Sequence, residues 1–280
     1  MEKLQKALQK ARDQRITSGL ADRDAAQGQA SPAQGVSRVD AAWEALTEVK
    51  PDRKALSQNF VTSLEADRAS AAFDILRTKT QLLMKKNNWT RLAITSPTAS
   101  CGKTTMASNL ALGFTRQTDV RVILIEFDLR RPNLSKMLGV APTHDVSRML
   151  TGDVPFEEQA IRIRSNAAIA MAQHASPDPT SLLLRNSTHE KLKEIEDIYA
   201  PDLLIFDLPP VLVSDDARAF LKNVDCAMIV AKAEGTSIGQ IDICEREIAE
   251  QTNVLGVVLN QYRHQSDIDY GYSDYHSPAD

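Results

Sequence analysis

The chain has 280 residues, of which 42% are hydrophobic, 25% are charged and 5% are aromatic. This length suits one globular domain with attached segments, or at most two domains. The formal net charge of −4, from 33 basic and 37 acidic residues, argues against a general nucleic-acid binder. The three cysteines are too few and too scattered for a disulfide framework or a four-ligand zinc site.

The sequence contains no apolar run that approaches the ~20 residues needed to span a bilayer. Its first residues, Met1 to Lys6, lack the apolar segment of a signal peptide. We therefore expect a cytoplasmic protein whose association with the inner membrane, if any, is peripheral and through a partner.

Residues 1–56 are predicted to form an N-terminal helix and a flexible linker. Over residues 2–15, Leu4 and Leu8 belong to a narrow apolar stripe at helical spacing, which suits either a docking helix or a frayed terminus. Residues 16–56 contain scattered Gly, Ser and Pro without a sustained period, so we expect disorder, with a transient helix over residues 41–49. At the other end, residues 261–280 are polar, acidic and rich in tyrosine, and are predicted to form a flexible tail.

Residues 57–260 are predicted to form the folded domain. A helical pattern over residues 57–86 precedes apolar runs that alternate with helical segments. Continuous apolar runs are typical of strands covered on both faces, and the helices between them imply parallel crossovers. The sequence therefore predicts an α/β fold with a mostly parallel sheet and helices on both faces. The expected strands are 92–95, 120–127, 203–206, 226–231 and 254–259, and the expected later helices are 104–117, 217–223 and 238–252.

A phosphate-binding loop is predicted between the first strand and the helix that follows it, in the stretch LAITSPTASCGKTTMASN (92–109). Small residues allow backbone amides to face phosphate groups, and the start of the helix adds partial positive charge. Lys103 would reach the β- and γ-phosphates, and the Thr104 hydroxyl would bind Mg²⁺. The standard pattern has glycine where this chain has Pro97, and the alternative is an ordinary strand–helix turn. The expected nucleotide-binding residues of the loop are Ser100, Cys101, Gly102, Lys103, Thr104 and Thr105.

Acidic residues follow two further strands. Glu126 and Asp128 end one apolar run, and Asp207 ends another. Ligands of parallel sheets collect at the carboxyl ends of strands, where carboxylates can hold Mg²⁺ directly or through water. An isolated Asp at such a place more often caps a helix or forms a turn, but two such sites after a Gly-Lys-Thr loop favour a metal-assisted phosphate site.

The phosphate loop, the segment EFDLRRP (126–132) and the segment DLPP (207–210) together resemble the bacterial tyrosine kinases of capsule and exopolysaccharide synthesis, over about residues 57–280. The resemblance implies a P-loop NTPase-like fold that uses ATP and Mg²⁺. It implies an autokinase that regulates exopolysaccharide synthesis and export. It also implies self-association, and a separate membrane-bound co-polymerase of the chain-length type as activator.

The resemblance also implies roles for individual residues. Lys103 would bind phosphates, Thr104 and Asp128 would work at Mg²⁺, and Asp207 would be the second acid near the metal. Asn260 lies where relatives contact adenine, and Glu126 or Asp128 would accept the proton of the acceptor tyrosine. Four of the five tyrosines fall after residue 261 and match a cluster that is autophosphorylated between subunits, although such a tail can also dock on a partner. These tyrosines are Tyr262, Tyr270, Tyr272 and Tyr275.

The chain departs from the family pattern at several positions. Ser100 replaces a loop glycine and requires either a negative φ or strain, and Glu126 replaces an aspartate. In the family, a Glu-x-x-Arg-x-x-Arg motif forms rings. In this chain only its last arginine is kept, as Arg77, and Asp74 places a negative charge where the motif has its first arginine. Thr98 stands where partitioning ATPases of the same fold carry lysine, which argues against that function.

Two other functions would use the same three segments. A P-loop ATPase could act as an assembly or positioning switch without kinase activity. A non-enzymatic scaffold could bind nucleotide while the changes at Ser100 and Glu126 remove catalysis. Phosphotyrosine formation separates the kinase from both alternatives.

Overall fold

A computed structural model describes residues 32–263 of the chain. The predicted helix over residues 2–15 and the tyrosines Tyr270, Tyr272 and Tyr275 lie outside the described residues. The chain divides into two units, residues 1–41 and residues 42–280, and the second contains the sheet. None of the helices that the structure describes combines the length and the apolar character needed to cross a membrane.

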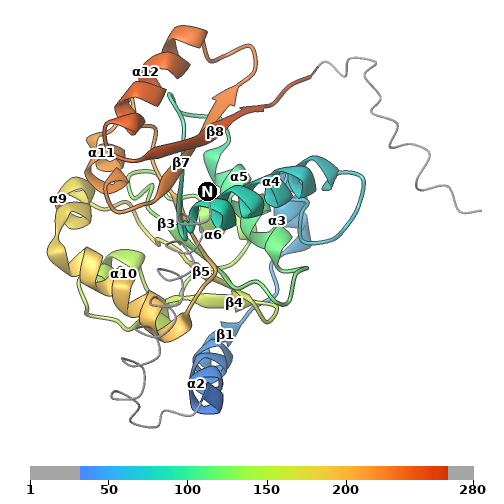
Figure 1. Cartoon of the computed structure of the whole chain (residues 1–280), viewed down its shortest axis with the longest axis vertical. Coiled ribbons are helices and arrows are strands. Elements are labelled where there is room, and N and C mark those ends of the chain that lie inside the picture. The colour runs from blue at the N-terminus through green and yellow to red at the C-terminus, as the bar shows by residue number, and fades with distance from the viewer. Residues whose placement is uncertain (1–31, 264–280) are drawn as a thin grey trace, which may run out of the picture. The chain divides into compact units, whose positions relative to one another are not determined.

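The described chain alternates between helices and strands (Figure 1). The helices are α2 Pro32–Ala45, α3 Arg53–Gln58, α4 Ala71–Asn87, α5 Lys103–Phe114, α6 Leu134–Leu138, α7 Val146–Leu150, α8 Phe156–Gln159, α9 Pro179–Leu184, α10 Asn186–Tyr199, α11 Asp215–Leu221 and α12 Ile238–Ala249. The strands are β1 Thr47–Glu48, β2 Arg91–Thr95, β3 Val122–Glu126, β4 Ile161–Ile163, β5 Ala167–Ala170, β6 Leu203–Asp207, β7 Cys226–Lys232 and β8 Asn253–Asn260.

The strands form one sheet in the order β1-β4-β5-β3-β6-β2-β7-β8. All neighbouring pairs are parallel except β4 and β5, which are antiparallel. Helices α4 and α5 lie on one side of this sheet, and α10, α11 and α12 lie on the other (Figure 1). The predicted α/β fold is therefore confirmed, because the central strands are buried on both faces as their apolar sequences require.

Three phenylalanines connect the carboxyl ends of β3 and β6 to the helix layer. The ring centroids of Phe127 and Phe206 lie 5.4 Å apart, and Phe220 of α11 packs edge-on to Phe127 at 4.6 Å. All three side chains are fully buried, and such aromatic contacts add stability beyond area burial alone. Because both strands end in acidic residues, this cluster fixes the place where those acids emerge.

Helix α4 begins at Ala71, later than the helical pattern predicted from residue 57. The side chain of Asn109 on α5 explains the difference, because it holds the preceding residues in turns. Its Oδ1 accepts hydrogen bonds from the amides of Thr62 and Ser63 at 2.8 and 3.1 Å, and its Nδ2 donates to the carbonyl of Phe60 at 2.9 Å. A buried amide that replaces helical hydrogen bonds overrides the local apolar pattern.

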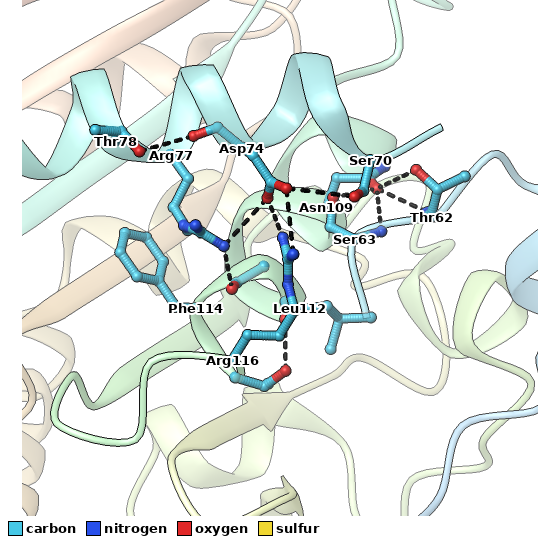
Figure 2. A network of polar contacts seen from close by, with 12 residues as sticks. Thr62, Ser63, Ser70, Asp74, Arg77, Thr78, Asn109, Leu112, Phe114 and Arg116 are labelled. Carbon is cyan, nitrogen blue, oxygen red and sulfur yellow. Dashed lines mark hydrogen bonds and ion pairs between the residues drawn. The ribbon is translucent and has the colours of Figure 1, made fainter. Parts of the chain in front are cut away.

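Asp74, the charge-inverted residue of the ring motif, forms ion pairs within its own chain (Figure 2). Its carboxylate contacts Arg77 at 3.2 Å and also pairs with Arg116, which lies just after α5. Arg77 in turn donates to the carbonyl of Gly113 at 2.7 Å. Asp74 therefore ties α4 to the end of α5 and neutralises two arginines of the same molecule.

The prediction of a disordered linker as far as residue 56 is wrong from residue 32 onward, where α2, β1 and the start of α3 form. Trp43 and Leu46 are buried with 2% and 1% exposure, and the indole Nε1 of Trp43 donates to the carbonyl of Tyr199 at 2.7 Å. Strand β1 then pairs with β4 at the edge of the sheet. Two isolated apolar residues and a two-residue strand produce no period, so pattern analysis could not detect this segment.

Replacing Trp43 with alanine should lower the free energy of unfolding by about 3–5 kcal/mol, the usual cost of deleting a buried aromatic side chain. The W43F variant keeps an aromatic ring and loses the hydrogen bond, so its loss should be closer to ~1 kcal/mol. Urea denaturation followed by circular dichroism measures both values. Equal stability of W43A and wild type would show that the segment is a linker after all.

Candidate active site

The phosphate loop lies at the centre of the sheet. It follows β2, which is flanked by β6 and β7, and it leads directly into α5 at Lys103. Gly102 precedes the helix with φ of 90°, a left-handed conformation that suits glycine. Ser100 also has a positive φ, 61°, so the serine that replaces the family glycine is accommodated with strain, at a cost of about 1–3 kcal/mol.

The end of β8 holds this loop from the side. The Nδ2 of Asn260 donates to the carbonyl of Cys101 at 2.9 Å, and the Nε2 of Gln261 donates to the carbonyl of Ser100 at 3.2 Å. The amide of Asn260 occupies the space where a Cβ on Gly102 would lie. Gly102 is therefore needed for two reasons, its left-handed backbone and the close approach of Asn260.

Lys103 and Asp128 face each other across the loop. The Nζ of Lys103 lies 3.5 Å from Oδ2 of Asp128, and the two residues are only 7% and 8% exposed. Asp128 comes directly after β3 and Lys103 starts α5, so the parallel sheet brings together residues that are 25 positions apart. A cation at a helix start beside a carboxylate suits the binding of phosphate with a metal ion.

Asp207 ends β6 and is fully buried. Among the described residues, neither of its carboxylate oxygens has a hydrogen-bond partner. Burial raises the pKa of Asp207 to about 7, and the charge of Lys103 and the nearby Thr104 hydroxyl offset this effect only partly. A buried carboxylate without partners is costly, so this position is suited to a cation that supplies the missing contacts.

These residues fit Mg²⁺ rather than a metal held entirely by protein. The described residues contain no group of three or more His, Cys, Asp or Glu side chains that could hold an ion. Magnesium is commonly bound through one or two carboxylates and keeps its other positions for water and substrate phosphates. Thr104, Asp128 and Asp207 supply such an incomplete set of oxygen ligands.

Glu126 has a different environment from the other acids. Its Oε1 accepts the amides of Asn133 and Leu134 at 2.6 and 2.8 Å, and its Oε2 accepts the amide of Ala172 at 3.0 Å. The residue is fully buried, and burial raises the pKa of its carboxyl group to about 7. This geometry does not match the expected role of Glu126 as proton acceptor. The side chain instead anchors the start of α6.

A cavity of about 500 Å³ opens beside the loop. Its walls come from the phosphate loop, from the segment that follows β3, and from the Pro209-Pro210 segment that follows β6. The predicted residues that line it are Ser100, Gly102, Lys103, Thr104, Thr105 and Asp128. Cys101, Glu126, Asp207 and Asn260 are not among the lining residues, and Tyr262 is 59% exposed.

Sequence reasoning did not assign roles to Arg130 and Arg131, which also line the cavity. Arg130 forms a two-point contact with the fully buried Asp216 of α11, with Nε to Oδ2 at 2.6 Å and Nη2 to Oδ1 at 3.0 Å. The signal was present in the Leu-Arg-Arg-Pro sequence, but no pattern indicates which acid an arginine will contact.

The G102A variant should lose stability and bind nucleotide more weakly, because the new methyl group strains the backbone and displaces Asn260 from the loop. Gly152 provides a matched control, since its φ is 84° and nothing lies within 4 Å of a Cβ placed there. G152A should show only the strain of a left-handed residue, about 1–2 kcal/mol. Thermal unfolding and ADP titration of both variants test this, and equal losses would contradict the role given to Asn260.

Comparison with known proteins places this geometry in a family. A family profile described as ParA, NUBPL iron-transfer P-loop NTPase, matches residues 89–268. The tyrosine-protein kinase Etk of Escherichia coli K12 is 28% identical over 209 residues, which cover 74% of this chain and 28% of Etk. The tyrosine-protein kinase YwqD of Bacillus subtilis is 26% identical over 204 residues, which cover 72% of this chain and 85% of YwqD.

Solved structures show the same relationship. The kinase domain of the Escherichia coli tyrosine kinase ETK superposes with a TM-score of 0.63 at 26% identity, covering 72% of this chain and 80% of that domain. Cobyrinic acid a,c-diamide synthase from Mycobacterium smegmatis, solved with an ATP analogue and magnesium, shares the fold with a TM-score of 0.53 at 21% identity, covering 64% of this chain and 75% of the synthase.

The chain spans less than a third of the length of Etk, while it spans most of YwqD. The resemblance to bacterial tyrosine kinases that the sequence motifs indicated is confirmed by these relatives. The chain belongs to the family described as ParA, NUBPL iron-transfer P-loop NTPase, and the curated relatives Etk and YwqD that it resembles are tyrosine-protein kinases.

Proposed function

We propose that this chain is an ATP-dependent protein-tyrosine kinase that phosphorylates its own C-terminal tyrosine cluster. The observation that carries the proposal is the meeting of Lys103, Asp128 and Asp207 at the carboxyl ends of the adjacent strands β2, β3 and β6, beside an open cavity. The kinases Etk and YwqD support the same conclusion by their similarity.

The nucleotide would be held by its phosphates. Backbone amides of residues 100–105 and the ammonium of Lys103 would contact the β- and γ-phosphate oxygens, and the start of α5 would add its partial positive charge. Thr104 and Asp207, with Asp128 beside them, would hold Mg²⁺. When bound, the ion would neutralise charge on the β- and γ-phosphates.

In the transfer, the phenolic oxygen of an acceptor tyrosine attacks the γ-phosphorus. A new O–P bond forms, the bond from the γ-phosphorus to the β–γ bridging oxygen breaks, and ADP leaves with that electron pair. The phenolic proton passes to the carboxylate of Asp128, which lines the cavity. A carboxylate can help only as the O–P bond forms, because the pKa of free tyrosine is about 10. The proposed acceptors are Tyr262, Tyr270, Tyr272 and Tyr275 of a neighbouring subunit.

The wider setting is also a proposal. A relative from Klebsiella pneumoniae that is 29% identical carries a name that places it in the cps region, which supports a role in exopolysaccharide or capsule synthesis and export. We propose that the chain works at the cytoplasmic face of the inner membrane, through a membrane-bound co-polymerase, and that it self-associates. Co-purification with such a partner would test the assignment.

The central test is incubation with Mg-ATP, followed by phosphotyrosine blotting and mapping of sites in residues 261–280. Wild type should become phosphorylated, and K103M should lose at least ~10²-fold in rate, because removal of one group that stabilises transition-state charge has effects of this size. Production of ADP and free phosphate without phosphotyrosine would indicate an ATPase switch instead. Tight ATP binding with neither product would indicate a scaffold.

Separate substitutions of Glu126, which ends β3, and Asp128, which follows it, distinguish their roles. D128N should abolish tyrosine phosphorylation, because it removes the carboxylate that is proposed to accept the proton and to lie beside Mg²⁺. E126Q should keep measurable phosphorylation but lose about 1–3 kcal/mol of stability, because its amide would face the N–H of Ala172 and leave that donor unpaired. Single-turnover kinetics and thermal unfolding measure the two effects. A stable E126Q protein with no activity would return Glu126 to the proton-accepting role.

A further inference from the structure

Two adjacent arginines after β3 have contrasting environments. The guanidinium of Arg130 pairs with the carboxylate of Asp216. The same carboxylate also accepts hydrogen bonds from the Ser214 hydroxyl at 2.7 Å and from the Thr180 hydroxyl. Arg131 is exposed and lines the cavity. Its guanidinium has no hydrogen-bond or ion-pair partner within residues 32–263.

The backbone around Arg131 is fixed on both sides. Upstream, the contact of Arg130 with buried Asp216 ties the segment to α11, and the carbonyl of Leu129 accepts the amide of Ser176 at 2.8 Å. Downstream, Glu126 accepts the amides of Asn133 and Leu134. The amide of Arg131 itself donates to Oδ1 of Asp128 at 3.3 Å. The segment is therefore rigid at the point where an unpaired cation meets the cavity.

We infer that the two arginines divide their roles, with Arg131 as the cation that contacts the terminal phosphate of the bound nucleotide and Arg130 as a positioning residue held by Asp216. This inference rests on the proposed binding of ATP. Lys103 and Arg131 reach the same cavity from different strand ends, so they would contact the γ-phosphate from two directions. A guanidinium suits this task, since its planar fork matches phosphate oxygens.

Arg130 cannot serve the same purpose without leaving its acid. Its departure would leave the carboxylate of Asp216, which is fully buried, without its only cation among the described residues. Removing one partner of a buried charge pair is strongly unfavourable. The geometry thus favours Arg131 as the phosphate ligand and Arg130 as the support of the segment.

Calorimetric titration of the full chain with a non-hydrolysable β,γ-imido analogue of ATP and with ADP, both with Mg²⁺, tests the inference. R131A should bind the ATP analogue about tenfold or more weakly, the loss expected for a charge-assisted hydrogen bond, and should bind ADP as wild type does. R148A, which removes an exposed arginine outside the cavity, should change neither affinity. Equal losses for both nucleotides, or no loss, would overturn the role of Arg131.

The positioning role has its own test. D216N should weaken binding of the ATP analogue more than binding of ADP, because a loosened segment misplaces Arg131. R130A should lose part of the preference for the ATP analogue over ADP, and R130K should recover some of it. If D216N lowers only the melting temperature and keeps the ratio of the two affinities, Asp216 is merely structural. If the wild-type protein binds neither nucleotide, the proposed function itself is wrong. If R131A binds both nucleotides normally and loses only tyrosine phosphorylation, Arg131 recognises the acceptor tyrosine and not the nucleotide.

Discussion

Burial of acidic side chains at the carboxyl ends of the parallel strands β3 and β6 is the constraint on which the site depends. Asp207 is fully enclosed and has no hydrogen-bond partner among the described residues, while Lys103 supplies the compensating charge nearby. Such an arrangement is expensive in a folded protein without a ligand. The sheet offsets the free-energy cost of burying these acids, because apolar strands and the phenylalanine cluster hold the strand ends rigidly in place.

The segment after β3 shows how a conservative change can alter the use of a residue. Glu126 pairs in register with Asp207, yet the carboxylate on its longer side chain contacts backbone amides at the start of α6 and after β5. Two acids support the segment after β3: Glu126, the last residue of that strand, accepts the amide of Asn133, and Asp216 of α11 pairs with Arg130. Glu126 therefore anchors the backbone next to the phosphate loop, and Asp128 is the acid of this segment that lines the cavity.

Most of the sheet could be predicted because its central strands are continuous apolar runs, and the loop could be predicted because Gly102 and Lys103 stand between a strand and a helix. The missed elements carry weak local signals. Strand β1 has two residues, and β4 and β5 are three and four residues long, so their stability comes from neighbours distant in sequence. The Arg130–Asp216 contact joins residues 86 positions apart, and no local pattern encodes such a partner.

The place where β8 ends has a geometric consequence for the acceptors. Asn260 touches the phosphate loop, and Gln261 contacts the same loop through the carbonyl of Ser100. Tyr262 follows only two residues after Asn260, so its Cα lies within about 7 Å of the Cα of that residue. If Tyr262 is an acceptor as proposed, the short span of backbone between them is enough to keep this tyrosine close to the loop.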